Sequence, residues 1–184
     1  MKTETHLAMD AEAIRKAIRR IAHEIVERND NISRLVVAGI PTRGVEVARR
    51  ISEHIAQIEG VAPAFGIVDV AMHRDDLSTR GRVTEIVPTE LPVDLDGRTV
   101  VIVDDVLFTG RSCRAAMDAL SDFGRPAQIQ YAVLVDRGHR ELPIRADYVG
   151  KNLPTSREEK IRVRFENLDG VPDSVSVVKP VKSA

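Results

Sequence analysis

The segment best suited to chemistry joins two adjacent carboxylates to a turn that carries a glycine and two hydroxyls. Asp104 and Asp105 follow four apolar residues, so they lie where a buried strand emerges, and Gly110 precedes a predicted helix. Backbone N–H groups of this turn and of the first helical turn would converge on a volume that suits a phosphate monoester. The hydroxyls of Thr109 and Ser112 add directed hydrogen bonds. Such charge-assisted bonds contribute about 1.5–3 kcal/mol each, so they outweigh the roughly 0.3–1 kcal/mol of the helix dipole.

The acidic pair requires a different part of the same ligand, because like charges would repel a phosphate. Carboxylates accept hydrogen bonds from vicinal sugar hydroxyls, and they can hold Mg²⁺ directly or through water. A ribose 5-phosphate, with a phosphate at one end and a diol in the middle, satisfies both halves of the segment. The alternative is a capped strand-to-helix turn with solvated aspartates.

Alternating strands and helices are predicted to position this segment. Apolar residues recur at helical spacing in three segments, and short apolar or alternating runs predict strands between them. The helical segments are 10–29, 47–58 and 113–120, and the strands are 35–40, 65–72, 99–103, 129–135, 148–149 and an edge strand at 161–165. This order predicts a parallel sheet covered on both faces. Ligands of such sheets bind beyond the carboxyl ends of the strands, so the loops after Ile40, Val103 and Val135 should share one edge.

The composition limits the class of protein. The 184 residues suit one domain spanning 1–184, with 43% hydrophobic and 30% charged residues. No apolar run approaches the roughly 20 residues of a membrane span, and the first ten residues lack the apolar core of a signal peptide, so we expect no membrane association and a cytoplasmic location. The single cysteine, Cys113, excludes an internal disulfide and a multi-cysteine metal site. With a net charge of −1, a nucleic-acid partner would require a local basic face.

The stretch from Val101 to Ser112, VIVDDVLFTGRS, resembles the phosphoribosyl-pyrophosphate (PRPP) signature of the type I phosphoribosyltransferases. Segments 13–24, 42–44, 74–78 and 134–148 are similar to those family members that also regulate pyrimidine operons, and this resemblance covers residues 10 to about 165. It implies an α/β fold with a central, mostly parallel sheet flanked by helices. It also implies a small hood at about 136–160 and a mobile loop at about 73–90.

The resemblance implies transfer of 5-phosphoribose from PRPP to uracil, which gives UMP and pyrophosphate. Cleavage of the C1–pyrophosphate bond places positive charge on the ribose ring and negative charge on the leaving group, so catalysis depends on positioning and electrostatics. No covalent nucleophile is required. Mg²⁺ is expected as cofactor, held mainly by PRPP, with Asp104 and Asp105 as the protein carboxylates that could contribute; no dedicated metal cluster is expected.

Site residues follow from the resemblance by position. Catalytic roles are expected for Arg43, Arg74, Asp104 and Asp105, and base binding for Val135, Asp136 and Arg137. PRPP or UMP would be bound by Thr42 and Arg43 in a pyrophosphate loop, and by Asp104, Asp105, Val106, Leu107, Phe108, Thr109, Gly110, Arg111 and Ser112. Pro41 stands where the family often has a lysine, so one possible cation is missing. The alternatives are an ordinary β-to-α turn at Thr42–Arg43, a solvated Arg74 and a simple turn at Asp136.

The resemblance also implies binding of pyrimidine-operon mRNA with UMP as co-regulator. Two groups of basic side chains are candidates for this contact: Arg19, Arg20, His23 and Arg28 in the first helix, and His139, Arg140, Arg145 and Lys151 beyond the strand predicted at 129–135. The alternative is a solvated helix face balanced by glutamates. Aromatic residues make up only 3% of the chain, so recognition of backbone and shape by the joined surface of a dimer or higher oligomer fits better than base stacking.

Three other functions compete with this interpretation. One is a non-catalytic regulator that senses a nucleotide and binds RNA. Another is a phosphoribosyltransferase for a different base. A phospho-receiver domain also carries paired aspartates at strand ends, but its acidic pair would follow an N-terminal strand and would not require Thr-Gly-Arg-Ser. The sequence does not distinguish transcription attenuation from translational repression.

Overall fold

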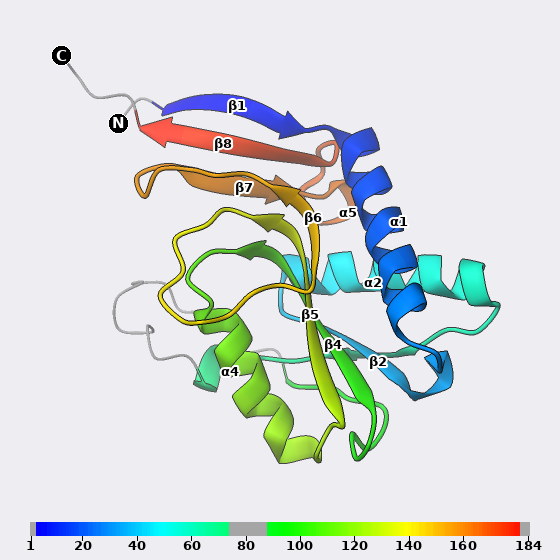
Figure 1. Ribbon diagram of the computed structural model, residues 1–184. Helices are drawn as coiled ribbons and strands as arrows, with labels where there is room; N and C mark the ends of the chain where they lie inside the picture. Colours follow the sequence, from blue (N-terminus) through cyan, green and yellow to red (C-terminus); the bar gives the residue numbers. More distant parts are fainter. Residues whose placement is uncertain (1–2, 74–87, 181–184) are drawn as a thin grey trace.

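The computed structural model describes residues 3–73 and 88–180, and its centre is a five-stranded parallel sheet (Figure 1). The strand order is β3-β2-β4-β5-β6, and each neighbouring pair is parallel. The strands are β2 (Leu35–Gly39), β3 (Ala64–Ile67), β4 (Thr99–Leu107), β5 (Gln128–Asp136) and β6 (Tyr148–Asn152). The predicted α/β class with a central parallel sheet is confirmed.

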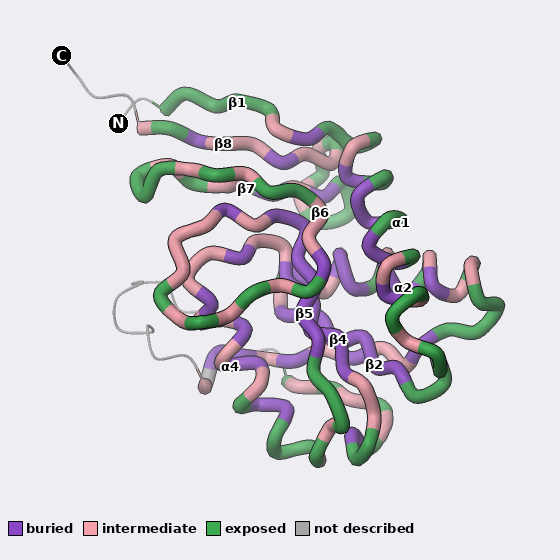
Figure 2. The backbone as a smooth tube through the Cα atoms, in the orientation of Figure 1, coloured by how far each residue is buried: buried purple, intermediate pink, exposed green. Residues whose placement is uncertain are grey.

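Helices cover both faces of this sheet, as the continuous apolar runs of its central strands predict. α1 (Ala11–Arg28) and α2 (Arg43–Glu59) pack on the side chains of Val37, Val101 and Leu134. α4 (Arg111–Leu120) packs on the opposite face, against Ile102 and Val133. From Val100 to Val103, successive residues of β4 therefore enter different cores, and Figure 2 shows β4 and β5 buried through most of their length.

The first helix begins and ends where its sequence indicates. The side chain of Asp10 caps it, because Oδ1 accepts a hydrogen bond of 2.8 Å from the backbone N–H of Ala13. Its buried residues, Ile14, Ile18, Ile21 and Ile25 among them, form the predicted apolar stripe. The basic residues lie on the solvent side of this helix.

A second, antiparallel sheet was not predicted from the sequence. It has the order β1-β8-β7, with β1 (Thr3–Met9), β7 (Lys160–Arg164) and β8 (Ser174–Pro180), and a short helix α5 (Glu166–Asp169) joins β7 to β8. β7 is at the edge, as expected, whereas β1 is almost entirely exposed (Figure 2), so it lacks the apolar alternation that marks a strand. The range expected for the hood, 136–160, contains the parallel strand β6, and it shares only Lys160 with this second sheet.

Several predicted boundaries were wrong for local reasons. The strand expected at 65–72 ends at Ile67, because Asp69 Oδ1 accepts from the N–H of Ala71 and turns the chain into a 3₁₀ helix, Ala71–His73. β4 does not end at Val103 but continues through the acidic pair to Leu107. β6 extends to Asn152 instead of ending at residue 149. Most of the expected mobile loop, including Arg74, lies outside the described residues.

Within the two described ranges, no helix combines the length and the apolar character that crossing a membrane requires.

Candidate functional site

The acidic pair lies in the last part of β4, at the carboxyl edge of the parallel sheet. Asp104 is 7% exposed, and its Oδ1 accepts a hydrogen bond of 2.9 Å from the N–H of Asp105. Asp105 Oδ1 in turn accepts 3.0 Å from the N–H of Val106. Burial raises the pKa of Asp105, and the hydrogen bond with Asp104 and the positive charge of Arg43 oppose this rise. The pair therefore favours partners that donate hydrogen bonds or carry positive charge.

The phosphate loop, defined as Leu107–Arg111, connects β4 to the N-terminus of α4. Gly110 has a φ of 94°, a left-handed conformation that favours glycine, and it directly precedes the helix. A Cβ at Gly110 would lie 3.3 Å from Cβ of Ile144, so the loop packs tightly on the segment after β5. The hydroxyl of Thr109 accepts a 3.4 Å hydrogen bond from the N–H of Arg111. The loop and the helix terminus together have the geometry of an anion site.

The pyrophosphate loop predicted at Thr42–Arg43 lies next to the acidic pair. It follows β2, contains a cis peptide bond between Pro41 and Thr42, and leads into α2. A Cβ at Gly44 would lie 2.7 Å from the carbonyl oxygen of Val103 and 3.0 Å from Cα of Asp104, so only glycine permits this approach. The first turn of α2 therefore packs directly on β4 at the acidic pair.

The base loop, defined as Asp136–Ile144, folds against the phosphate loop. The N–H of Arg137 donates to the carbonyl of Leu107 at 3.1 Å, and the N–H of Glu141 donates to the carbonyl of Thr109 at 3.0 Å. The Arg111 side chain also pairs with Glu141 at 3.0 Å. The base loop is therefore joined to the phosphate loop by main-chain hydrogen bonds and by a side-chain ion pair.

Arg140 lies in the middle of the base loop, where its guanidinium joins both ends of this loop to the phosphate loop. It donates to the carbonyls of Phe108 and Ile144, each at 3.0 Å, and forms an ion pair with Asp136. Asp136 also accepts 3.0 Å from the N–H of Gly138. Arg140 and Asp136 are separated by only three residues, so their spacing in the sequence could have indicated this ion pair. The sequence analysis instead predicted an RNA contact for Arg140.

Arg137 is a buried cation that the sequence assigned to base binding. Its side chain donates to the Thr155 hydroxyl at 3.0 Å and to the carbonyls of Ser156 and Glu159 at 3.0 and 2.8 Å. Its guanidinium also lies over the ring of Phe108, 4.0 Å from the centroid. Burial lowers the pKa of Arg137, and the charge of Glu159 opposes this shift. Val135, the other neighbour predicted to bind the base, has a fully buried side chain in the core.

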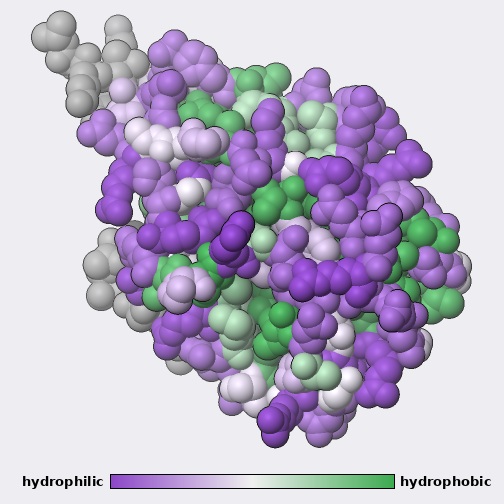
Figure 3. All heavy atoms as spheres, in the orientation of Figure 1, coloured by the Kyte–Doolittle hydropathy of each residue, from purple (hydrophilic) through white to green (hydrophobic). Residues whose placement is uncertain are grey.

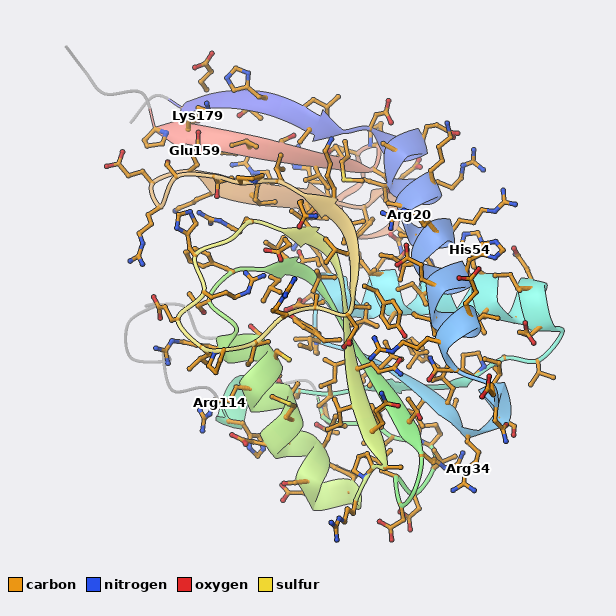
Figure 4. The ribbon with its side chains drawn as sticks, viewed as in Figure 1. Arg20, Arg34, His54, Arg114, Glu159 and Lys179 are labelled. Carbon is orange, nitrogen blue, oxygen red and sulfur yellow. The ribbon has the colours of Figure 1, made fainter. Side chains whose placement is uncertain are left out.

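The structure divides the eight basic residues predicted to contact RNA into two separate groups. Arg20 donates to the carbonyls of Val149 and Gly150 at 3.1 and 2.6 Å, and it lies on the side of α1 that faces β6 (Figure 4). Six of the eight lie on α1, on β6 or just before it: Arg19, Arg20, His23, Arg28, Arg145 and Lys151. His139 and Arg140 belong instead to the base loop, which lies on the α4 side of the molecule (Figure 1).

We call the first group the α1–β6 face. Lys151 donates to the carbonyl of Ala8 at 2.9 Å, and Arg28 pairs with Asp147 at 2.7 Å. Arg19, His23 and Arg145 are exposed. Side chains around α1 are predominantly hydrophilic in Figure 3, as expected for a solvated or polyanion-binding surface.

The carboxyl ends of β2, β4 and β5 thus bring together the Thr42–Arg43 turn, the acidic pair with the phosphate loop, and the base loop with its arginines. The phosphoribosyl transferase domain family matches residues 9–165. The bifunctional protein PyrR of Roseiflexus sp. (strain RS-1) is 55% identical over 171 residues, covering 93% of each chain. PyrR of Halalkalibacterium halodurans is 51% identical over 175 residues, covering 94% of this chain and 97% of that protein. The chain belongs to the phosphoribosyltransferase family, within its group of bifunctional PyrR proteins.

Solved structures with the same fold include hypoxanthine phosphoribosyltransferases. The Trypanosoma cruzi enzyme aligns with a TM-score of 0.70 at 17% identity, covering 95% of this chain and 97% of that one. The Staphylococcus aureus enzyme also gives 0.70, at 19% identity and with 95% and 93% coverage. At this level of identity the likeness establishes the fold, and the predicted phosphoribosyltransferase fold is thereby confirmed.

Proposed function

We propose that the chain transfers 5-phosphoribose from PRPP to uracil, forming UMP and pyrophosphate, and that with UMP bound it binds pyrimidine-operon mRNA. The observation that carries the enzymatic part is the convergence of Thr42–Arg43, Asp104–Asp105 and the phosphate loop at one sheet edge. These three elements match the three charged or polar parts of PRPP: its pyrophosphate, its ribose diol and its 5-phosphate.

Each part of the site has a separate task in this reaction. N–H groups of the phosphate loop and the hydroxyls of Thr109 and Ser112 hold the 5-phosphate. The acidic pair accepts hydrogen bonds from the ribose hydroxyls and favours the positive charge that develops on the ring. Arg43 carries positive charge beside the acidic pair, where it meets the negative charge of the departing pyrophosphate.

Mg²⁺ fits this site as an ion shared between protein and substrate. Residues 3–73 and 88–180 contain no cluster of three or more His, Cys, Asp or Glu side chains arranged to hold a metal. Asp104 and Asp105 are the carboxylates that would contact the ion, and PRPP would supply most of the remaining oxygens. When bound, Mg²⁺ supplies charge that neutralises the pyrophosphate.

The uracil would lie beside the base loop. Asp136, held by Arg140 and by the N–H of Gly138, has a fixed carboxylate at the end of β5. The ring of Phe108, between Arg137 and His139, adds an aromatic surface to the same region. Rigid polar and aromatic groups of this kind select a planar base at low entropic cost.

We place the RNA contact on the α1–β6 face and expect a dimer to join two such faces in the cytoplasm. The exposed side chains of Arg19, His23 and Arg145, with Arg20 beside β6 and Lys151 on it, form a surface that can contact phosphates of a folded RNA. UMP, the product at the sheet edge, would be the ligand that reports the pyrimidine level.

The first experiment measures UMP formation from uracil, PRPP and Mg²⁺. We expect product from the wild-type chain and a loss of at least about 100-fold in kcat for Asp104→Asn combined with Asp105→Asn. A substitution of Arg34, which is exposed and contacts the carbonyl of Gly97, serves as control. Absence of product from folded wild-type chain would favour a non-catalytic regulator, and preference for hypoxanthine, guanine or orotate would assign another base.

The second experiment titrates a pyrimidine-operon leader RNA with and without UMP. We expect tighter binding when UMP is present, together with a steep decrease in affinity as salt increases. Equal affinity for the leader and for an unrelated hairpin would exclude the regulatory part of the proposal without affecting the enzymatic part.

A further inference from the structure

A row of polar contacts joins one face of α2 to the turn between β7 and β8. Arg43 Nη2 lies 2.5 Å from Asp169 Oδ1, and its Nε donates 2.8 Å to the carbonyl of Val163. One helical turn further along, Asn167 donates to the buried carboxylate of Glu46 at 2.8 Å. Arg43, Glu46 and Arg50 share one face of α2, because they are spaced three and four residues apart.

Arg50 forms the third contact, an ion pair with Asp173. Asp173 also accepts 2.9 Å from the N–H of Glu166, and Arg50 additionally bonds Glu46 at 2.6 Å. The turn is thus attached to α2 at three successive levels. In Figure 1, α5 lies close to the N-terminal half of α2.

Only the first of these contacts reaches the reaction site. Arg43 is the first residue of α2, and its charge opposes the rise in the pKa of Asp105, whereas Arg50 lies two turns further along the helix. A guanidinium has five N–H donors, and the contacts with Val163 and Asp169 use two of them. Pairing with Val163 and Asp169 therefore does not use the full donor capacity of the guanidinium.

Asp169 is itself fixed by its surroundings. Its second oxygen accepts 2.9 Å from the N–H of Phe165, and Phe165 is fully buried in the core. That backbone hydrogen bond, followed by the charge of Arg43, lowers the pKa of Asp169, and burial opposes the shift. An ionised carboxylate in a fixed place can determine the rotamer of a long flexible partner.

We propose that Asp169, together with the carbonyl of Val163, positions the guanidinium of Arg43 for the pyrophosphate of PRPP. The second sheet thereby contributes to the reaction through its connecting turn, although it lies outside the parallel sheet that carries the site. Asp169 is a positioning residue, since it acts through Arg43. This inference rests on the proposed function, which assigns the pyrophosphate to Arg43.

The test compares Asp169→Ala with Asp173→Ala in steady-state kinetics of UMP formation. Both changes remove an ion pair between the same turn and α2, so a general loosening of the turn would affect both alike. We expect Asp169→Ala to raise the KM for PRPP about tenfold, because a charge-assisted contact that orients Arg43 is lost, and to leave the KM for uracil within about twofold. Asp173→Ala should leave both KM values within about twofold. Asp169→Asn keeps the size of the side chain and should raise the KM for PRPP about fivefold, so it carries the test if the alanine variant fails to fold.

Arg43→Ala separates the two hypotheses. Combined with Asp169→Ala, it should raise the KM for PRPP no further than Arg43→Ala alone, because the positioned group is already gone. If Arg43→Ala alone leaves that KM unchanged, the pyrophosphate assignment and this inference both fail. If Arg43→Ala raises it but the Asp169 variants behave like Asp173→Ala, only the positioning role of Asp169 is overturned.

Discussion

The base loop and the α1–β6 face both contain clustered basic residues, but they use these residues differently. In the base loop, Arg137 and Arg140 donate to backbone carbonyls of other segments and lie largely buried. On the α1–β6 face, Arg20 also donates to carbonyls of another segment, those of Val149 and Gly150, but it pairs with Glu24 of its own helix and stays exposed. Arg19, His23 and Arg145 are exposed as well. The first arrangement determines the shape of a site, whereas the second leaves cations that can exchange partners at low cost.

This difference shows that sequence proximity of arginines does not indicate a common role. Arg140 stands close to Arg145 in the sequence and carries the same charge, yet the chain places it beside the phosphate loop. Four substitutions follow: one changes the acidic pair of the reaction site, and the other three each affect one of the two compared regions more than the other.

The largest expected effect is on catalysis, from Asp105→Asn. We expect kcat to decrease at least about 100-fold, because the charge that favours the developing positive ribose is lost. The same variant should unfold at a higher denaturant concentration than wild type at pH 7. Burial raises the pKa of Asp105. At pH values between the ordinary aspartate pKa and the raised value, folding therefore makes the Asp105 carboxylate take up a proton.

The stability contribution of Asp105 therefore decreases as pH rises through that interval, and above it the ionised carboxylate opposes folding. Denaturant unfolding of both proteins at several pH values measures the effect, and the advantage of Asp105→Asn should vanish below the ordinary aspartate pKa. An advantage of equal size at every pH would contradict this explanation.

The next largest effect is on stability, from Arg137→Ala. The change leaves the acceptors of Thr155, Ser156 and Glu159 without their buried donor and removes the contact with Phe108. We expect a loss of about 3 kcal/mol in the free energy of unfolding. Urea denaturation measures this loss. The control is Arg145→Ala, which changes an exposed arginine nearby in the sequence, and its free energy of unfolding should stay within about 0.5 kcal/mol of the wild-type value. Equal losses in the two variants would remove the distinction between the regions.

Arg140→Ala should affect uracil more than RNA. Without the guanidinium, Asp136 loses its ion pair and the Phe108 carbonyl loses a donor, so the base loop is less well ordered. We expect the KM for uracil to rise about tenfold, with the salt dependence of RNA binding unchanged. The reverse pattern, a weaker salt dependence of RNA affinity with an unchanged KM for uracil, would show that Arg140 contacts RNA.

Most of the parallel sheet could be predicted, because its strands are buried on both faces and read as apolar runs of ordinary length. The acidic pair and phosphate loop were equally clear, since Asp104 to Ser112 is contiguous and its geometry is set by one strand, one glycine and one helix. Local sequence was sufficient there. The extension of β4 through the acidic pair was missed because aspartates are depleted in strands.

Contacts between distant segments could not be predicted in this way. Arg43 and Asp169 are 126 positions apart, and only the pairing of β7 with β8 brings the connecting turn to α2. β1 gave no signal because six of its seven residues face solvent at least in part. The basic residues were found by composition, but composition does not say which face of the fold they occupy.

The smallest expected effect is on RNA affinity, from Arg19→Ala. Arg19 is exposed on α1, so its removal should leave stability and UMP synthesis unchanged. Loss of one phosphate contact should weaken leader RNA binding severalfold and reduce the slope of log affinity against log salt by about one. Arg34→Ala removes the same charge from the segment before β2, and Figure 4 shows that side chain at the opposite end of the molecule from the second sheet. If both variants reduce the slope equally, net charge controls the affinity; if only Arg19→Ala does, the cations of the α1–β6 face contact the RNA directly.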